Sequence, residues 1–409
     1  MSAWRVRVVP FVLCLLTGAT APPAEESRCD ANVQLADRDQ TAAGSLRSLT
    51  SEELRLATRW KEETFSRRDL RSIELPLRRG VPRTESRAAG AKLWVLLTNG
   101  DRLAATEATI GDDHLTLSHP NAGEIELGLE FVRAILQPGD DPERNRVVER
   151  LVLRGEYAAD ALLLVNGDRI EGELQDWQDG RCRIGAAAGE LNVANEQLRA
   201  VVLDPALSVR PERRETWSLV QLTDGSRLSA RDVRWVDDQW VMTAEAGFAF
   251  TLPCDQVRRV DLFGARVAAL SQREPTEYEH LPFLSAKADY AVDRDVTGGP
   301  LQSEENDPAW GVGVLSGSRL SWDLDGTWDR LEVRVGVDDA AADRGSVDFI
   351  VNVDGVEVCR SGRRTGGDPV IDLGPIPLRS ARRLELIVDY ADGGDIRDFA
   401  NWYRPTLLR

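Results

Sequence analysis

Histidine is scarce in this chain, and negative charges outnumber positive ones. It has three histidines in 409 residues and a formal net charge of -17. The charge excludes a nucleic-acid partner, because phosphate binding depends on a basic surface, and it disfavours an anionic membrane surface for the same reason. The sequence contains no H-E-x-x-H, G-x-S-x-G, Walker or dinucleotide motif. We therefore expect a protein that is not an enzyme and has no catalytic residue.

The sequence also lacks a C-x-x-C pair and an apolar run long enough to span a membrane. Residues 1–21 combine two arginines, a short apolar run and a small-residue end, which predicts a signal peptide. We expect an exported protein (periplasmic, cell-surface or secreted) with no stable membrane span after cleavage. The cysteines beyond this segment are too far apart in sequence for a zinc motif, and we expect them to stay unpaired. They are Cys29, Cys182, Cys254 and Cys359.

One short stretch recurs along the chain. VLLTNGDRL at residues 95–103 returns as LLLVNGDRI at 162–170 and as VQLTDGSRL at 220–228. Glycine after asparagine or aspartate supplies the positive φ of a tight hairpin turn. We interpret the three copies as turns with solvated side chains. The alternative is a carboxylate or guanidinium site that is used three times.

A second pattern, apolar-Arg-x-apolar, recurs at a regular spacing that is typical of a structural repeat. Its arginines are Arg71, Arg133, Arg199 and Arg258. We interpret them as strand residues on a solvated face, and the alternative is a shared ligand groove. Turns and arginines together predict four small β-barrel-like units. Their ranges are 22–80, which is degenerate and lacks the turn, 91–140, 158–206 and 216–264.

Longer alternating strands follow the repeats, at residues 319–324, 330–337, 346–353 and 384–390. Asp-Gly pairs mark several of the bends between them. This pattern predicts a β-sandwich over residues 275–409. The expected fold class is therefore all-β, with 42% hydrophobic and 29% charged residues typical of a soluble protein of two or more domains.

The last third of the sequence resembles the NPCBM domain, a carbohydrate-binding module. The matching stretches are GVGVLSGSRLSWDLDG (311–326), LEVRVGVDD (331–339), GSVDFIVNVDG (345–355) and DFANW (398–402). The resemblance implies a galactose-binding-like jelly roll whose loops can hold a sugar, often with a structural calcium. The upstream repeats resemble small β units of exported bacterial proteins that carry this domain. Leu315 stands where the family commonly has histidine.

Aromatic side chains are the other route to sugar binding, because their faces stack on the apolar side of a pyranose. Trp322 shares a strand face with two leucines and is expected in the core. The candidates for a sugar platform are Trp310, Trp328, Trp402 and Tyr403. For Trp402 the alternative is packing in the core or at its rim.

The stretch DRDVTGGPLQSE places oxygen side chains at positions that match a calcium loop. The predicted ligands are Asp293, Asp295, Thr297 and Glu304. No helical pattern flanks the stretch, so an EF-hand is not expected. A calcium site of another kind at the start of the sandwich is the remaining possibility, and no other cofactor is expected.

The expected function is therefore binding of a glycan or glycoconjugate outside the cell by an exported, non-catalytic protein. The C-terminal domain would bind, and the repeats would serve as a spacer or a platform for protein contacts. The alternative is a structural or assembly protein of the cell envelope whose sandwich docks protein, which Leu315 favours. A third reading is an accessory subunit of an exported degradative complex.

Overall fold

The computed structural model describes most of the chain. The described ranges are 29–37, 41–76, 91–111, 113–283, 286–299, residue 301, 310–342, 344–392 and 394–409. The predicted signal peptide and Glu304 lie outside them. The described residues form mostly β-strands, and their one α-helix is α1 (Pro142–Arg154). The all-β expectation is confirmed.

The strands between residues 30 and 263 fall into four groups along the chain. The first group is β1 (Asp30–Leu35), β2 (Thr41–Leu49), β3 (Glu53–Ala57), β4 (Glu62–Ser66) and β5 (Leu70–Glu74). The second is β6 (Leu93–Leu97), β7 (Arg102–Ala105), β8 (Glu107–Gly111), β9 (His114–His119), β10 (Gly123–Gly128) and β11 (Val132–Leu136). The third is β12 (Asp160–Leu164), β13 (Arg169–Gln178), β14 (Arg181–Ala186), β15 (Gly189–Ala194) and β16 (Leu198–Val202). The fourth is β17 (Trp217–Leu222), β18 (Arg227–Val236), β19 (Gln239–Ala244), β20 (Ala249–Pro253) and β21 (Val257–Phe263).

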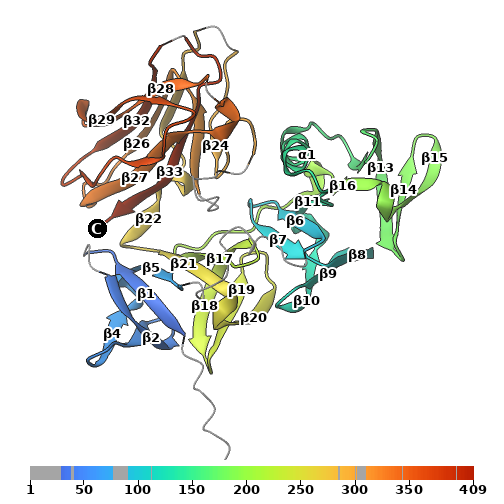
Figure 1. Ribbon diagram of the computed structural model, residues 1–409, viewed down its shortest axis with the longest axis horizontal. Coiled ribbons are helices and arrows are strands. Elements are labelled where there is room, and N and C mark those ends of the chain that lie inside the picture. Colours follow the sequence, from blue (N-terminus) through green and yellow to red (C-terminus); the bar gives the residue numbers. More distant parts are fainter. Residues whose placement is uncertain are drawn as a thin grey trace, which may run out of the picture.

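The groups are not arranged in space as they are in sequence. Figure 1 shows the first group at one end, then the fourth, the second and the third. The last strands of neighbouring groups pair antiparallel, with Ile73 of β5 opposite Val260 of β21 and Ile135 of β11 opposite Val201 of β16. Each of these residues lies two positions after the arginine of its frame. Equivalent strands therefore join the groups in pairs.

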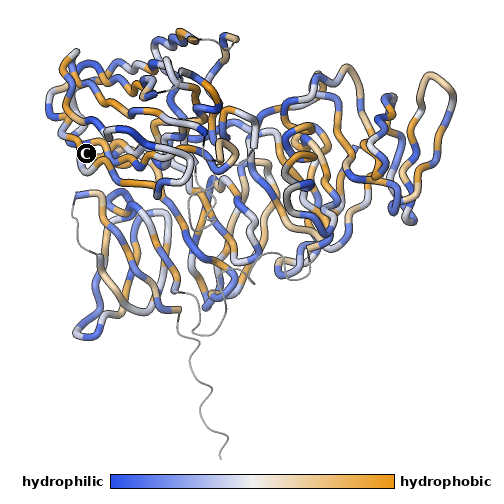
Figure 2. Tube along the Cα trace, turned by 45° about the horizontal axis from the view of Figure 1, so that its top comes forward, coloured by the Kyte–Doolittle hydropathy of each residue, from blue (hydrophilic) through white to orange (hydrophobic). Residues whose placement is uncertain are grey.

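Alternation along the strands directs apolar side chains inward, and Figure 2 shows hydrophobic and hydrophilic segments interleaved throughout. Buried residues from all four groups form one continuous cluster, which includes Val33, Leu103, Ile184 and Val260. The groups therefore share a core and do not pack as separate globules.

The rest of the chain forms a sandwich of two antiparallel sheets. One sheet contains β22 (Val267–Ala269), β24 (Ala291–Val292), β25 (Gly311–Leu315), β27 (Arg330–Val337), β30 (Ile371–Asp372), β31 (Ile376–Pro377) and β33 (Phe399–Leu408). The other runs in the order β23 (Glu277–His280), β26 (Ser318–Asp323), β32 (Arg383–Tyr390), β28 (Ser346–Val353) and β29 (Val356–Thr365). Buried apolar side chains of both sheets fill the space between them.

The sandwich rests on the first and fourth groups (Figure 1). The Trp310 ring packs edge-on against Phe263, with ring centroids 5.4 Å apart. Arg71 of the first group forms an ion pair with Glu332 of β27. Arg330 donates a hydrogen bond to the Ala36 carbonyl at 3.1 Å. Apolar and charged contacts together fix one edge of the sandwich on the groups.

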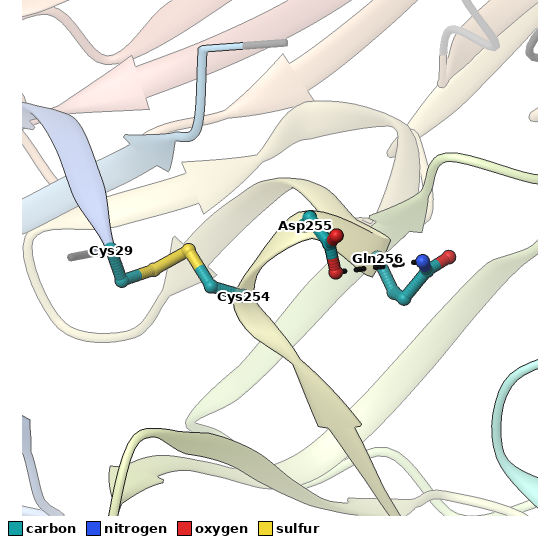
Figure 3. The surroundings of a disulfide bond; sticks show 4 residues. All are labelled: Cys29, Cys254, Asp255 and Gln256. Carbon is teal, nitrogen blue, oxygen red and sulfur yellow. Dashed lines mark hydrogen bonds between the residues drawn. A yellow bond between two sulfur atoms is a disulfide. The ribbon is translucent and has the colours of Figure 1, made fainter. Parts of the chain in front are cut away.

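A disulfide joins Cys29, just before β1, to Cys254, just before β21 (Figure 3). Their Cα atoms are 5.6 Å apart although they are separated by 225 positions in sequence. The expectation of unpaired cysteines is wrong for these two. Cys182 is buried and Cys359 is half-buried, and both are free thiols.

Candidate functional site

The three recurring turns have the backbone that the sequence predicts. Gly100, Gly167 and Gly225 have φ of 90°, 95° and 90°. In each turn the side chain before the glycine accepts a hydrogen bond from the residue after it, as in Asp101 N to Asn99 Oδ1 at 3.1 Å. Glycine is needed at these positions because an L side chain is strained at such φ.

The expectation of solvated turn side chains is wrong for two of the copies. Asp101 is 2% exposed, and its carboxylate accepts hydrogen bonds from the backbone N and the hydroxyl of Ser229. Burial raises the pKa of Asp101. Burial also opposes ionisation of Asp224, but the hydrogen bond and charge of His119, 3.1 Å away, hold the pKa of Asp224 below its usual value. These polar groups therefore serve the contact between the second and fourth groups.

The recurring arginines have different neighbours. Arg71 pairs with Glu332, whereas Arg133 donates to the Val152 carbonyl and lies over the Tyr157 ring. All four are half-buried. They therefore do not line one shared groove, and they do not lie on a fully solvated face either.

The predicted sugar platform is wrong, because the structure buries all four of its aromatic residues. Trp310, Trp328, Trp402 and Tyr403 have exposed fractions of 4%, 3%, 0% and 2%. A ring must present a face to solvent to stack on a sugar. Trp322 is also buried, as predicted.

Each of these rings has a packing role. Trp402 lies in the sandwich core, edge-on to Phe349 with centroids 5.1 Å apart. Trp328 lies beneath the Arg409 guanidinium, 4.0 Å from the ring centroid. The Tyr403 hydroxyl accepts a hydrogen bond from Asn401 at 3.0 Å. They hold the sandwich together and do not offer a binding surface.

Three of the four predicted calcium ligands are described, and their oxygens already have protein partners. The Asp293 carboxylate accepts from Ser271 Oγ at 3.2 Å, from Gly311 N at 3.0 Å and from Gln272 Nε2. Asp295 accepts from Thr297 Oγ1 and from Gly299 N. Within the described ranges no cluster of three or more His, Cys, Asp or Glu side chains could hold a metal ion. A calcium site that includes Glu304 stays a prediction.

One end of the sandwich presents an exposed aromatic ring. Phe283 is 66% exposed. It is the most exposed aromatic side chain among the described residues of the sandwich. Its ring lies 6.1 Å from that of Tyr390, at 61°. The Tyr390 hydroxyl donates to the Leu281 carbonyl. Gly317 has a φ of 76°, and a Cβ there would collide with the Tyr390 hydroxyl and the Leu281 carbonyl, so this glycine makes room for their hydrogen bond.

Carboxylates surround this ring pair. Asp395 accepts a hydrogen bond from Phe283 N at 3.0 Å. Asp398 accepts from Ser346 N at 2.8 Å, and the Ser346 hydroxyl donates to the Asp392 carbonyl at 2.7 Å. Burial raises the pKa of Asp398, and the charges of Asp395 and Asp392 raise it further. Asp395 and Asp398 have exposed fractions of only 5% and 1%, whereas Asp392 is exposed to solvent. An exposed ring and an exposed carboxylate are groups that a sugar needs, because its C–H face stacks and its hydroxyls donate.

A second polar cluster lies inside the same end of the sandwich. Asn401, fully buried, donates from Nδ2 to Asp338 Oδ2 and to the Tyr403 hydroxyl, both at 3.0 Å. Burial raises the pKa of Asp338 to about 6, and the charge of Asp295 contributes. Burial also raises the pKa of Tyr403. These groups are enclosed, so they support the loops and do not contact a ligand at the surface.

A cavity of about 430 Å³ lies between the second and third groups. Its lining includes Lys92, Thr106, Glu107, Gln137, Trp177 and Asn195. The Trp177 indole donates to Asn195 Oδ1 at 2.6 Å, so its polar edge faces the protein.

No helix in the described part of the chain has the length and hydropathy needed to cross a membrane.

The sequence interpretation missed Phe283 and Tyr390. Phe283 follows β23 in a segment without alternation, and Tyr390 is the last residue of β32. A usable signal is present for Tyr390, because an aspartate- and glycine-rich loop follows it directly at residues 391–395. An aromatic residue at a strand end beside such a loop is more exposed than one in the middle of a strand.

Residues 275–408 match the family model of the NPCBM/NEW2 domain. A search of curated proteins finds no match. Among solved structures, the chain is similar to CBM51 from Clostridium perfringens GH95 in complex with methyl-galactose, at 22% identity over 35% of this chain and 99% of that one, with a TM-score of 0.31. It is also similar to CBM51-2 in complex with GlcNAc and INT domains from Clostridium perfringens ZmpB, at 21% identity and a TM-score of 0.32, over 44% of this chain and 38% of that one. The comparisons thus relate the C-terminal third of the chain, residues 275–408, to the NPCBM/NEW2 domain.

Proposed function

We propose that the chain is an exported, non-catalytic protein that binds a glycan or glycoconjugate through the loop end of its NPCBM/NEW2 domain. The observation that carries the proposal is the exposed Phe283 ring, supported by Tyr390 and bordered by carboxylates, at one end of a domain whose family model is that of a carbohydrate-binding module. In this proposal the four strand groups act as a spacer or a platform for protein contacts.

The chemistry of the loop end supports sugar over a purely apolar ligand. One face of a pyranose carries C–H groups that pack on an aromatic ring, and its hydroxyls donate to carboxylates. Phe283 supplies the ring. The buried Asp395 anchors the Phe283 backbone, and Asp392, three residues before it, is the exposed acceptor of the same loop. Several such contacts are needed, because binding must offset the lost freedom of the sugar.

The test is a glycan array with the full chain, followed by calorimetric titration of any sugar that binds. Phe283→Ala should abolish detectable binding and leave the melting temperature unchanged. Val356→Ala is the matched control, because Val356 is 64% exposed at the start of β29, at the other end of the sandwich. Binding that survives Phe283→Ala would overturn the proposed site.

The second candidate is a structural or assembly protein of the cell envelope whose sandwich docks protein. The observation that favours it is that the sandwich already makes a protein contact with the groups, through Arg71 and Glu332 among others. Leu315, half-buried at the end of β25, also stands where the family commonly has histidine. Absence of binding to every glycan on the array, with and without calcium, would favour this candidate.

A further inference from the structure

The second and fourth groups meet at their turns, and the contact is reciprocal. Arg102 of β7 lies directly opposite Arg227 of β18. Ser229 N donates to Asp101 Oδ2 at 2.8 Å, and in the other direction Ala104 N donates to Ser226 Oγ at 2.9 Å. We call this set of contacts the turn contact.

The turn contact has the form of a twofold interface. When the recurring turns are aligned on their glycines, Arg102 matches Arg227 and Asp101 matches Ser226. The donors Ala104 and Ser229 also occupy one aligned position. Each group therefore offers the same patch to the other, as identical subunits do across a twofold axis. A unit with this patch can in principle meet a copy of itself.

The third group has the same turn, but no other strand group covers it in the described part of the chain. Gly167 has a φ of 95°, close to that of Gly100, and Asn166 Nδ2 donates to Asp168 Oδ2 as Asn99 Nδ2 does to Asp101. Residues 165–169 are exposed, and Figure 1 shows the third group at the end of the molecule. The turn is thus already in the conformation that the contact requires.

Apolar residues at this end of the third group are left partly uncovered. Leu164 and Ile170 are only partly buried. Val165 is 41% exposed. The residues aligned with Leu164 and Ile170 in the other two groups are exposed by 4% or less: Leu97, Leu103, Leu222 and Leu228. Leu164 and Ile170 are therefore less buried than their counterparts in the two groups that meet at their turns.

We propose that the protein forms a twofold dimer in which the turn of the third group meets the same turn of a second copy of this chain. Arg169 of one copy lies opposite Arg169 of the other, in the positions that Arg102 and Arg227 hold. Each Asp168 carboxylate accepts from the partner copy's backbone N–H at the position aligned with Ala104 and Ser229, which is Glu171.

The charges of this contact set its salt dependence. Glu171 replaces the small residues Ala104 and Ser229, and it forms an ion pair with Arg169. The two copies together bring four carboxylates, from Asp168 and Glu171, to two Arg169 guanidinium groups. Repulsion between exposed charges is screened by salt. The dimer therefore strengthens as ionic strength rises.

The first test is the mass of the full chain in solution by sedimentation, over a concentration series at low and at high salt. We expect a monomer–dimer equilibrium that shifts to dimer in high salt. Ile170→Glu should leave a monomer, whereas Val358→Glu, at an exposed valine of β29, should leave the equilibrium unchanged. Glu171→Ser, which restores the residue of the fourth group, should tighten the dimer about tenfold. A gain of affinity cannot result from misfolding.

The second test is cross-linking at the twofold axis. Arg169→Cys, in a Cys359→Ser background, should form a disulfide-linked dimer on mild oxidation, because residues at the aligned positions 102 and 227 are directly paired. Arg181→Cys, at an exposed position at the start of β14, should remain monomeric. A monomer at every concentration and salt, an oligomer larger than a dimer, or no cross-link through residue 169 would overturn the proposal.

Discussion

The Asp101 carboxylate accepts two hydrogen bonds from Ser229, one from the backbone N at 2.8 Å and one from the hydroxyl at 2.9 Å. These bonds join the second group to the fourth. Asp101→Ala should therefore destabilise the protein by about 1–3 kcal/mol, because it leaves a buried N–H without an acceptor. Urea unfolding with a probe for the β structure measures the change.

Asp168→Ala is the matched control for this prediction. Asp168 occupies the same turn position in the third group but is exposed. At protein concentrations where the chain is monomeric, this variant should change the free energy of unfolding by less than about 0.5 kcal/mol. Equal losses for the two variants would contradict the role of Asp101 in joining the groups.

Loss of the Cys29–Cys254 disulfide should lower stability. The bond closes a long loop, and in the chain-entropy model such a cross-link restricts the unfolded chain by about 2–5 kcal/mol. Cys254→Ser should lower the melting temperature in calorimetry, and a reducing agent should lower that of the wild type by the same amount. Cys182→Ser is the control and should keep the wild-type response to the reducing agent, because Cys182 is a free thiol. A reductant effect that persists in Cys254→Ser would have another source.

The buried carboxyl of Asp338 should make stability fall as pH rises. Its pKa in the folded protein is about 6, above the ordinary value of 3.8, so the folded state binds this proton more tightly than the unfolded chain. Its contribution is fully present below about pH 4 and is lost as pH rises through 6. Between pH 4.5 and 7.5, Asp338→Asn should gain up to about 3 kcal/mol relative to wild type.

Asp339→Asn is the control for the pH effect, because Asp339 is the exposed neighbour of Asp338. Melting temperatures from pH 4.5 to 7.5 for wild type and both variants give the comparison. The melting temperature of the Asp339 variant should change with pH as that of the wild type does. A smaller fall in melting temperature with rising pH for Asp338→Asn than for wild type would identify Asp338 as the titrating group. Parallel profiles for wild type and Asp338→Asn would contradict the assignment.

Trp402→Ala should affect stability and not selectively affect sugar binding. Trp402 is fully buried against Phe349, so truncation leaves a cavity that costs about 3–5 kcal/mol. Denaturant unfolding measures the loss, with Phe283→Ala as the control that should keep full stability. A stable Trp402→Ala variant that no longer binds a glycan would restore this residue to the binding site.

Calcium at residues 293–304 stays a prediction with a direct test. A bound ion stabilises the folded state, so chelation should lower the melting temperature and added calcium should restore it. Asp293→Ala should remove that response. A melting temperature that chelation does not change would show that the hydrogen bonds of Asp293 and Asp295 hold this segment without an ion.

Local features of the fold were predictable from the sequence. The glycines at 100, 167 and 225 correctly predicted turns, because the positive φ of a tight turn is a local property of the backbone that favours glycine. The arginine frames correctly predicted strands. The strands β5, β11, β16 and β21 each begin at the first apolar residue of a frame. Helix α1 was missed, although its apolar residues Val148 and Val152 are spaced as on one helix face.

Features that depend on neighbouring groups were not predictable. The turns at Asp101 and Asp168 have nearly the same sequence, yet one is buried and the other exposed, because only the first meets another group. Cys29 and Cys254 come together through the pairing of the first and fourth groups, which no spacing rule contains. Trp402 and Phe283 differ in exposure through the sandwich packing, and composition alone does not distinguish them.

The spatial order of the groups also sets an order of assembly. The second and third groups are neighbours in the chain, so their pairing closes a short loop and can form early. The first group must wait for the fourth, and until then the edge of β5 has no partner from β21. An unpaired edge invites wrong partners. The Cys29–Cys254 disulfide joins the first group to the fourth, so it can form only after these two groups have paired. Protection of Cys29 from alkylation during folding would therefore time the pairing of the first group with the fourth.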